Sequence, residues 1–210
     1  HRIGIAIGDE ARAKHHQDVR EHGYSDRHYG LTFFSPTLNI ARDPRWGRTT
    51  ECFSEDPLLT SDMGVSFIKG MQGDDPYYLK TVATAKHFVA NNEENRRLGG
   101  SATVDEVSLR EYYFPAFKDA VVRGYVKSIM GAYNALNGIP CCANSMLLTD
   151  VLRKEWGFDG AVISDWGSVS GGAESIAAGL DLCMPGPRPD YAPTALAAAR
   201  RGALEERCVD

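Results

Sequence analysis

The sequence has no long hydrophobic run and no strong charge of either sign. No stretch approaches the roughly 18 apolar residues that a membrane-spanning helix needs, so we expect no membrane partner. The 210 residues carry a formal net charge of −5, which argues mildly against nucleic acid as a partner. Apolar and charged fractions of 43% and 24% are typical of a soluble globular protein with one sizeable core.

Signatures of metal and nucleotide binding are also missing. The five cysteines fit no zinc spacing and are too sparse for a disulfide scaffold, so we interpret them as small buried hydrophobic residues. The sequence contains neither G-x-G-x-x-G nor G-x-x-x-x-G-K-[ST]. An open sheet of the nucleotide-binding type usually has a glycine-rich turn after its first strand, so this absence argues against that architecture.

Short apolar runs alternate with longer helical patterns along the chain. The predicted strands cover residues 31–36, 81–88, 126–134, 160–166 and 179–185. The predicted helices cover 56–73, 103–124, 147–158, 170–179 and 190–202, with caps at Asp56 and Thr103. Strands that alternate with helices predict a parallel sheet with both faces covered.

Chemically distinctive residues follow almost every predicted strand. They are Lys86 and His87, Tyr133 and Asn134, Asp165 and Trp166, and Met184 and Pro185. In a barrel these strand ends converge on one face, where the active site lies. We therefore predict an α/β fold of the (β/α)8 TIM-barrel type, with residues 1–210 as one domain. Five visible strands and a chain that opens inside a helical pattern predict a fragment, incomplete at its N-terminus and its C-terminus.

Two clusters leave more than one interpretation open. Residues 41–57 gather arginines and acids around Trp46, as in a salt-bridged surface loop, but this set also suits a polyhydroxylated ligand. Lys86 and His87 could be a surface pair, or a cation and an imidazole in a barrel mouth. Since neighbours on a strand face opposite sides unless the strand bends, we expect His87 to lie deeper.

Asp165 follows an apolar run directly. A carboxylate in that position is costly unless it is paired or used. It could cap the following helix, although Ser168 and Ser170 are better placed for that. In a mouth lined by Arg48, Lys86 and His87, we expect these cations to lower the pKa of Asp165, which would keep it ionised as a nucleophile.

Seven sequence blocks together resemble the N-terminal domain of glycoside hydrolase family 3. They are RDPRWGR, AKHFVANN, LREYYFPAF, AYNALNGIP, LRKEWGFDG, VISDWG and AGLDLCMPG, and they occur between about residues 41 and 186 in the order and spacing of that family. Seven blocks in sequence are far more specific than any one of them.

The resemblance implies roles for individual residues. Asp165, in the SDW block, would be the catalytic nucleophile. Arg48, Lys86 and His87 would bind hydroxyls of the sugar in the first subsite. Tyr133 would lie near the nucleophile, Trp166 would form part of the sugar platform, and Met130 would be a candidate for the subsite wall. No metal ion or organic cofactor is implied.

The resemblance is incomplete in two respects. The family usually has a further sugar-binding aspartate upstream of the opening helix, and this chain begins after it. In β-glucosidase-type members the acid/base is a glutamate from a following domain, so we expect it outside these residues. A branch that needs no second domain carries a KHFPGHG-type loop, whereas this chain reads KHFVANNEEN.

The implied reaction is hydrolysis of O-glycosidic bonds in a small carbohydrate substrate. We expect a retaining, exo-acting β-glucosidase that releases terminal non-reducing β-D-glucose through a covalent glycosyl-aspartate intermediate. A β-xylosidase or α-L-arabinofuranosidase of the same family is the alternative enzyme. A sugar-binding but inactive fragment, without its acid/base, is the alternative from another class.

Overall fold

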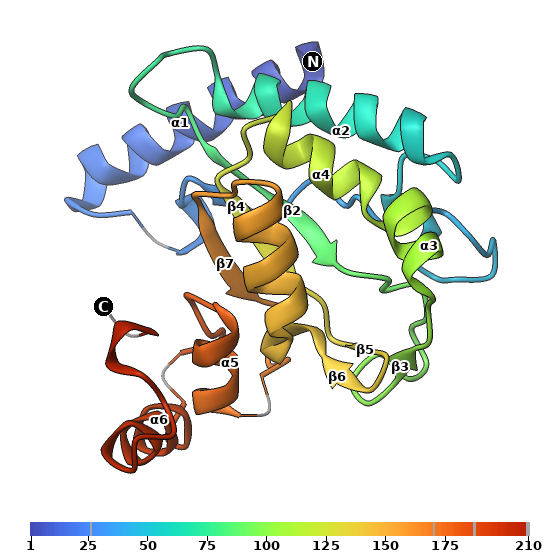
Figure 1. Cartoon of the computed structure of the whole chain (residues 1–210). Helices are drawn as coiled ribbons and strands as arrows, with labels where there is room; N and C mark the ends of the chain where they lie inside the picture. Colours follow the sequence, from blue (N-terminus) through green and yellow to red (C-terminus); the bar gives the residue numbers. More distant parts are fainter. Residues whose placement is uncertain (26, 170, 187, 209–210) are drawn as a thin grey trace.

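The computed structural model describes residues 1–25, 27–169, 171–186 and 188–208. Its main sheet has the strand order β1-β2-β4-β7, with every neighbouring pair parallel. These strands are β1 (Thr32–Phe33), β2 (Val82–Phe88), β4 (Ser128–Gly131) and β7 (Ala161–Ser164). Among the described residues the sheet does not close, so β1 and β7 are its edges (Figure 1).

Helices pack against the sheet and against one another. They are α1 (Arg2–His22), α2 (Pro57–Gln72), α4 (Pro115–Val122) and the helical segment Met146–Glu155. The short α3 (Glu106–Ser108) and the helical turn Leu109–Tyr113 lead into α4. Helix α1 lies along α2, and α2 lies beside α4 (Figure 1). The axes of α1 and α2 can approach closely at Gly4 because it has no Cβ. A Cβ there would lie only 2.6 Å from Phe67 O.

Aromatic side chains fill the core directly beneath the end of β2. Phe88 is fully buried, and its ring centroid lies 5.1 Å from that of Phe117 and 5.8 Å from that of Trp156. Phe114 packs edge-on against Trp156, with centroids 5.4 Å apart. Tilted and edge-on aromatic pairs of this kind contribute beyond their buried area. The last residues of β2, which include Lys86 and His87, are therefore anchored by the core.

A small second sheet ties together two loops of the first. It consists of β3 (Ser101–Ala102), β5 (Ala135–Leu136) and β6 (Ile139–Pro140). Asn137 and Gly138 connect β5 to β6 with φ values of 49° and 88°, as a tight hairpin turn of the Asn-Gly type requires. Because β3 pairs with β5, the loop after β2 is held against the loop after β4.

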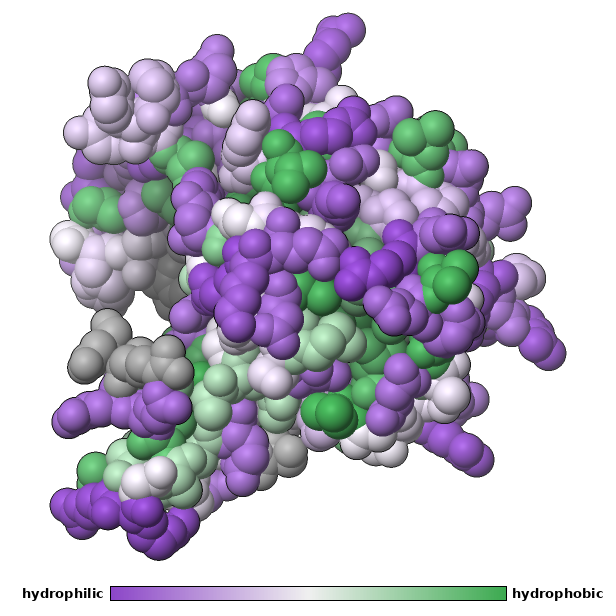
Figure 2. Space-filling model, viewed as in Figure 1, coloured by the Kyte–Doolittle hydropathy of each residue, from purple (hydrophilic) through white to green (hydrophobic). Residues whose placement is uncertain are grey.

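The remaining helices, α5 (Gly172–Ala178) and α6 (Tyr191–Arg200), pack on each other beyond β7. Figure 2 shows a weakly hydrophobic surface over these helices, while most of this face of the molecule is hydrophilic. No helix among the described residues is long and apolar enough to cross a membrane.

Most predicted elements are present, and two predictions are wrong. Residues 179–185 form no strand; only Leu182 bridges to Ile163. The cap of the helix predicted from residue 103 is Asp105, whose carboxylate accepts from Ser108 N at 2.9 Å, and not Thr103. The predicted cap Asp56 is confirmed, accepting from Leu59 N at 2.7 Å. The start of the helix predicted at 170–179, Ser170, lies outside the described residues.

The chain is thus an α/β structure built on a parallel sheet, as predicted, and forms part of a TIM-barrel-like domain. In parallel sheets of this class the carboxyl ends of the strands carry the functional residues. Here the loops that leave β2, β4 and β7 start at that edge (Figure 1).

Candidate active site

The structure brings the predicted site residues together at the carboxyl edge of the main sheet. Lys86 and His87 lie at the end of β2, Met130 lies in β4, Tyr133 follows β4, and Asp165 and Trp166 follow β7. Arg48 comes from the loop before the short turn Thr49–Glu51, and its Nη2 reaches 3.1 Å from His87 Nε2. Residues up to 118 positions apart in the sequence (48 and 166) therefore share one site.

Asp165 is held by its main chain and leaves one carboxylate oxygen unbound. Its N–H donates to Gly131 O at 3.1 Å, continuing the pairing of β4 with β7. Oδ1 accepts from Trp166 N at 2.7 Å. Oδ2 is buried and has no hydrogen-bond partner within the described part of the chain. This oxygen lies 3.7 Å from His87 Nε2 and is the one available for chemistry.

The expected effect of the cations on Asp165 is wrong in its net direction. Burial raises the pKa of Asp165, and this outweighs the hydrogen bond from Trp166 N and the charges of Arg48, Lys86 and Arg97, which all act to lower it. Its side chain is only 13% exposed, so the carboxylate loses more hydration than these contacts replace. The ionised form is consequently less stabilised, and more basic, than in water.

Below Asp165, the alternation of side chains along each strand determines which residues lie on the same face of the sheet as this carboxylate. Ile163 lies two residues earlier and therefore on the same face as Asp165. Met130 is paired with Ile163 in register and is 3% exposed. Met130 thus lies beneath the carboxylate rather than beside it, where it can form the apolar floor of the site.

His87 is neutral and buried, as its expected deeper position requires. Asn39 Oδ1 accepts from His87 Nδ1 at 2.9 Å, and Arg48 Nη2 donates to Nε2 at 3.1 Å. Burial lowers the pKa of His87 to about 3, and the charges of Arg48 and Lys86 act in the same direction. His87 and Asp165 therefore form no ion pair, although they lie close together.

Arg48 is fixed by a bidentate salt bridge to Glu51. Arg48 Nε lies 2.7 Å from Glu51 Oε1, and Nη2 lies 2.9 Å from Oε2. This contact lowers the pKa of Glu51 and raises that of Arg48. A planar, doubly bonded guanidinium keeps its orientation, so the third contact, to His87, is held as well.

Lys86 places a second cation, after Arg48, at the carboxyl edge of the sheet. Burial lowers the pKa of its ammonium, and the nearby Glu51 and Asp165 oppose this. Within the described residues the ammonium forms no hydrogen bond or salt bridge. A partly dehydrated ammonium with unused N–H groups is suited to donate to ligand hydroxyls.

Tyr133 and Trp166 lie on the open side of the site. The Tyr133 hydroxyl donates to Trp166 O at 2.6 Å, and burial raises the pKa of this phenol, with the Asp165 charge adding to it. The Arg97 guanidinium lies 4.8 Å from the centroid of the Tyr133 ring. The indole of Trp166 is 57% exposed, which leaves a ring face available for stacking.

The chain after Leu182 is fastened to the strand that delivers Asp165. Met184 N donates to Ser164 Oγ at 2.8 Å, and Ser164 Oγ donates to Met184 O at 3.3 Å. Gly167 N also donates to Met184 O, at 2.7 Å. Residues 182–184 thus brace both ends of the turn that contains Asp165.

Two residues that the sequence did not single out, Asn39 and Arg97, belong to this site, and Glu51 joins it from the charged cluster at residues 41–57. Glu51 follows Arg48 by three residues, a spacing at which opposite charges meet in a helical turn. Asn39 lies between two buried residues, Leu38 and Ile40, and a polar side chain in such a run signals a buried hydrogen-bond partner. For Arg97, in a charged loop, the sequence carries no comparable signal.

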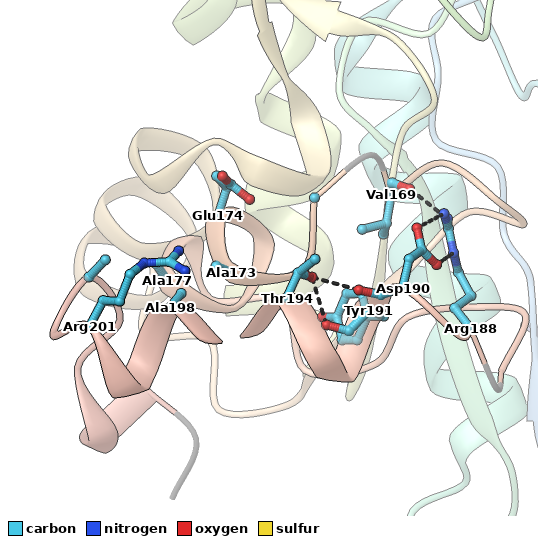
Figure 3. A pocket seen from close by; sticks show the side chains of 13 residues that line it. Val169, Ala173, Glu174, Ala177, Arg188, Asp190, Tyr191, Thr194, Ala198 and Arg201 are labelled. Carbon is cyan, nitrogen blue, oxygen red and sulfur yellow. Dashed lines mark hydrogen bonds and ion pairs between the residues drawn. The ribbon is translucent and has the colours of Figure 1, made fainter. Parts of the chain in front are cut away.

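Outside this site, neither a metal centre nor a second catalytic cluster stands out among the described residues. No group of three or more His, Cys, Asp or Glu side chains within the described ranges could hold a metal ion. A pocket between α5 and α6, shown in Figure 3, contains no predicted site residue. The guanidinium of Arg188 in this pocket donates to Asp190 and to Val169 O, so it already has hydrogen-bond partners within the protein (Figure 3).

Residues 13–205 match the family model described as the glycosyl hydrolase family 3 N-terminal domain. The chain belongs to glycosyl hydrolase family 3. The chain is 44% identical over 208 residues to a β-glucosidase of Rhizobium radiobacter, covering 99% of this chain and 23% of the relative. Family 3 relatives therefore extend far beyond the matched region.

Two further family 3 likenesses bear on specificity. β-D-Xylosidase 3 of Arabidopsis thaliana is 40% identical over 201 residues, covering 86% of this chain and 25% of the relative. The structure of β-glucosidase 3B from Thermotoga neapolitana in complex with α-D-glucose has a TM-score of 0.83 at 38% identity, covering 99% of this chain and 27% of that one. The chain spans about a quarter of the length of these proteins.

Proposed function

We propose that this chain supplies the nucleophile and most of the first sugar subsite of a retaining, exo-acting β-glucosidase. The observation that carries the proposal is Asp165 Oδ2, a buried carboxylate oxygen with no partner among the described residues, beside Lys86 and His87. A carboxylate that has lost hydration without gaining a partner is a stronger nucleophile than one in water.

In the proposed reaction Asp165 Oδ2 attacks the anomeric carbon as the bond from that carbon to the glycosidic oxygen breaks. The leaving oxygen takes a proton from a second carboxyl group. That group then removes a proton from water, which attacks the same carbon, breaks the ester to Asp165 and restores the original configuration. Retaining enzymes hold the two carboxyl groups roughly 5–5.5 Å apart.

The polar side chains around Asp165 would hold the sugar. Lys86 and Arg48 donate to sugar hydroxyls, and His87, whose Nε2 accepts from Arg48, lines the same subsite. Trp166 supplies an exposed ring face as the platform, while Met130 closes the site from below. Tyr133 keeps the Trp166 main chain in place through its hydrogen bond.

The general acid would come from outside these residues. Glu51 is the carboxylate bound to Arg48 in this site, and its pKa is lowered by that contact. A carboxyl group with a lowered pKa is a poor proton donor near neutral pH. We therefore propose that a further domain supplies the acid/base, and that residues 1–210 belong to the N-terminal catalytic domain.

A β-xylosidase or α-L-arabinofuranosidase is the second candidate, because relatives named as xylosidases are 40–42% identical to this chain. Glucose differs from xylose in carrying a hydroxymethyl group on the ring. Initial rates of the full-length protein on nitrophenyl β-D-glucoside, β-D-xyloside and α-L-arabinofuranoside separate the candidates. A kcat/KM for the xyloside above that for the glucoside would overturn the glucosidase assignment.

The nucleophile is tested by trapping and by rescue. A 2-deoxy-2-fluoro glycoside with a good leaving group should label Asp165, identified by peptide mass spectrometry. Asp165→Gly, which should be inactive, should regain turnover of a dinitrophenyl glycoside with azide and give the glycosyl azide of inverted configuration. Asp159→Gly, at an exposed carboxylate bound to Lys127, is the matched control. Labelling of another residue would contradict the proposal.

A turnover assay tests the alternative that this chain is an inactive, sugar-binding fragment. Measured on the isolated 210 residues, turnover that disappears in Asp165→Asn would exclude the interpretation that this chain only binds sugar. Binding without turnover, with full activity in the full-length protein, would instead support an acid/base supplied from elsewhere.

A further inference from the structure

We propose that Asn39 is a positioning residue that holds the His87 ring as the Nδ1–H tautomer, so that the lone pair of Nε2 receives the Arg48 guanidinium. Asn39 makes no hydrogen bond with Asp165 and acts through His87. The consequence for ligand recognition rests on the proposed glycosidase function, whereas the tautomer itself does not.

Asn39 clamps His87 through both of its amide atoms. Asn39 Oδ1 accepts from His87 N and from His87 Nδ1, each at 2.9 Å. Asn39 Nδ2 donates to His87 O, also at 2.9 Å. Asn39 is 3% exposed and His87 is 1% exposed, so water does not compete for these bonds. The segment that carries Asn39 continues the pairing of β1 with β2, through the bridge of Thr37 to Lys86.

The contacts determine where the ring proton lies. The main-chain N–H and C=O of His87 fix the orientation of the Asn39 amide, because Oδ1 must face the donor and Nδ2 the acceptor. Oδ1 carries no proton, so Nδ1 of His87 must donate to it. On the other side of the ring, Arg48 has no lone pair to offer, so Nε2 must accept. Both neighbours therefore require the same neutral tautomer.

The charges around the ring favour this state. Arg48, in the loop before the turn Thr49–Glu51, Lys86, in β2, and Arg97, in the loop after β2, all oppose a positive charge on His87. Glu51 acts in the other direction, as does Asp165, 3.7 Å away. Burial is the largest contribution and opposes the charge as well. The ring is thus neutral at neutral pH without any need for Asn39 to exclude the proton.

The role of Asn39 is to select between the two neutral forms. If Nε2 carried the proton, it would point this N–H at Arg48 and lose the acceptor. With the proton on Nδ1, the single lone pair of Nε2 accepts from Arg48 and helps to fix the guanidinium that is proposed to bind the sugar.

The tautomer can be observed directly in the full-length protein without ligand. Neutron diffraction from deuterated crystals should show a deuteron on His87 Nδ1 and none on Nε2. A deuteron on Nε2 in the wild-type protein would overturn the proposal, whether or not the protein hydrolyses glycosides. Asn39→Asp should keep the Nδ1 deuteron, because its carboxylate retains an acceptor for both N–H groups.

Kinetics distinguish positioning from a purely structural role. Asn39→Leu has the same shape but no polar atoms, and should lower kcat/KM about ten-fold or more, by analogy with removal of the partner that orients a metal-ligating histidine. Asn39→Asp should recover a large part of that loss. Equal losses in the two variants would contradict the proposal.

Asn92→Leu is the matched control. Asn92 is also buried, and its amide donates to the main-chain carbonyl of Ile40 at 2.6 Å. Its replacement should lower the melting temperature while leaving the His87 deuteron on Nδ1. If Asn39→Leu does not fold, the neutron map of the wild-type protein and the activity of Asn39→Asp still decide the matter.

Discussion

The hydroxyl of Tyr133 and the main-chain carbonyl of Trp166 are 2.6 Å apart, within hydrogen-bond distance. This bond joins the loop after β4 to the loop after β7, two residues beyond the paired residues Gly131 and Ser164. Asp165, between Ser164 and Trp166, also donates its N–H to Gly131 O. The main chain around Asp165 is therefore held both to β4 and to the loop that follows it.

Removing the Tyr133 hydroxyl should loosen this turn. Tyr133→Phe should lower the free energy of unfolding by about 1 kcal/mol, the typical net contribution of one hydrogen bond, and should lower kcat. Urea unfolding and steady-state kinetics measure the two effects. Tyr112→Phe is the control, because the Tyr112 hydroxyl also donates to a main-chain carbonyl, Glu55 O at 3.2 Å. Equal losses of kcat in both variants would argue against a role in the turn.

Asp165→Asn should abolish turnover and stabilise the fold. Since burial raises the pKa of Asp165, the folded state binds the proton more tightly than the unfolded state, whose pKa is about 3.9. The wild-type protein therefore loses stability as pH rises through the folded pKa. The variant should gain about 0.5–2 kcal/mol at pH 7, the common range for a stabilising substitution, and nothing below about pH 3.9. Thermal melts at pH 7 and pH 3.5 test this, and an equal gain at both would contradict it.

His87 should make the protein acid-sensitive. Its pKa is about 3 in the folded state and about 6.5 when unfolded, so the unfolded state takes up the proton first. The stability from the neutral ring is complete above about pH 6.5 and falls by up to roughly 1.4 kcal/mol per pH unit towards pH 3. His87→Asn, which keeps a donor for Asn39, should show a shallower decline in urea titrations between pH 7 and 5. Parallel declines would rule out this contribution.

Gly131 should tolerate no side chain unless its neighbour shrinks. A Cβ at Gly131 would lie 2.7 Å from Cys142 Sγ, and Cys142 is buried. Gly131→Ala should therefore cost about 1–3 kcal/mol, as overpacking commonly does, and should displace the carbonyl that receives Asp165 N. Adding Cys142→Ala removes the clashing sulfur and should restore stability and kcat. A double variant no better than Gly131→Ala would show that the backbone, rather than the sulfur, sets the limit.

The fold was predictable from the sequence where local signals and burial agree. The apolar runs that end at Phe88, Gly131 and Ser164 are mostly buried, so their composition alone predicts buried strands. The same reasoning failed at residues 179–185, where Leu182 pairs with Ile163 at a single bridge. A short apolar run reports burial but not hydrogen-bond geometry. The β5–β6 hairpin was not predicted, although Asn137-Gly138 is a strong turn signal.

The site was predictable as a set of residues but not as an electrostatic environment. Its members were found through strand ends and through the resemblance to family 3, and the structure brings them together. The direction in which the Asp165 pKa shifts depends on the balance between burial and the nearby charges. Neither the depth of this side chain nor its distance from those charges can be read from the local sequence. Likewise, the pairing of Asn39 with His87 joins residues 48 positions apart, which composition and spacing do not reveal.

Residues 182–184 have a further consequence for how this chain can vary. They are fastened to Val162 and Ser164 on one side of the nucleophile and to Gly167 on the other. Helix α5, between these fixed points, buries Ser175 and Ala178, and Asp181 N donates to Val162 O at 2.9 Å. A change of length between Leu182 and Met184 would therefore shift Asp165. The spacing of these three residues is thus a constraint on the chemistry.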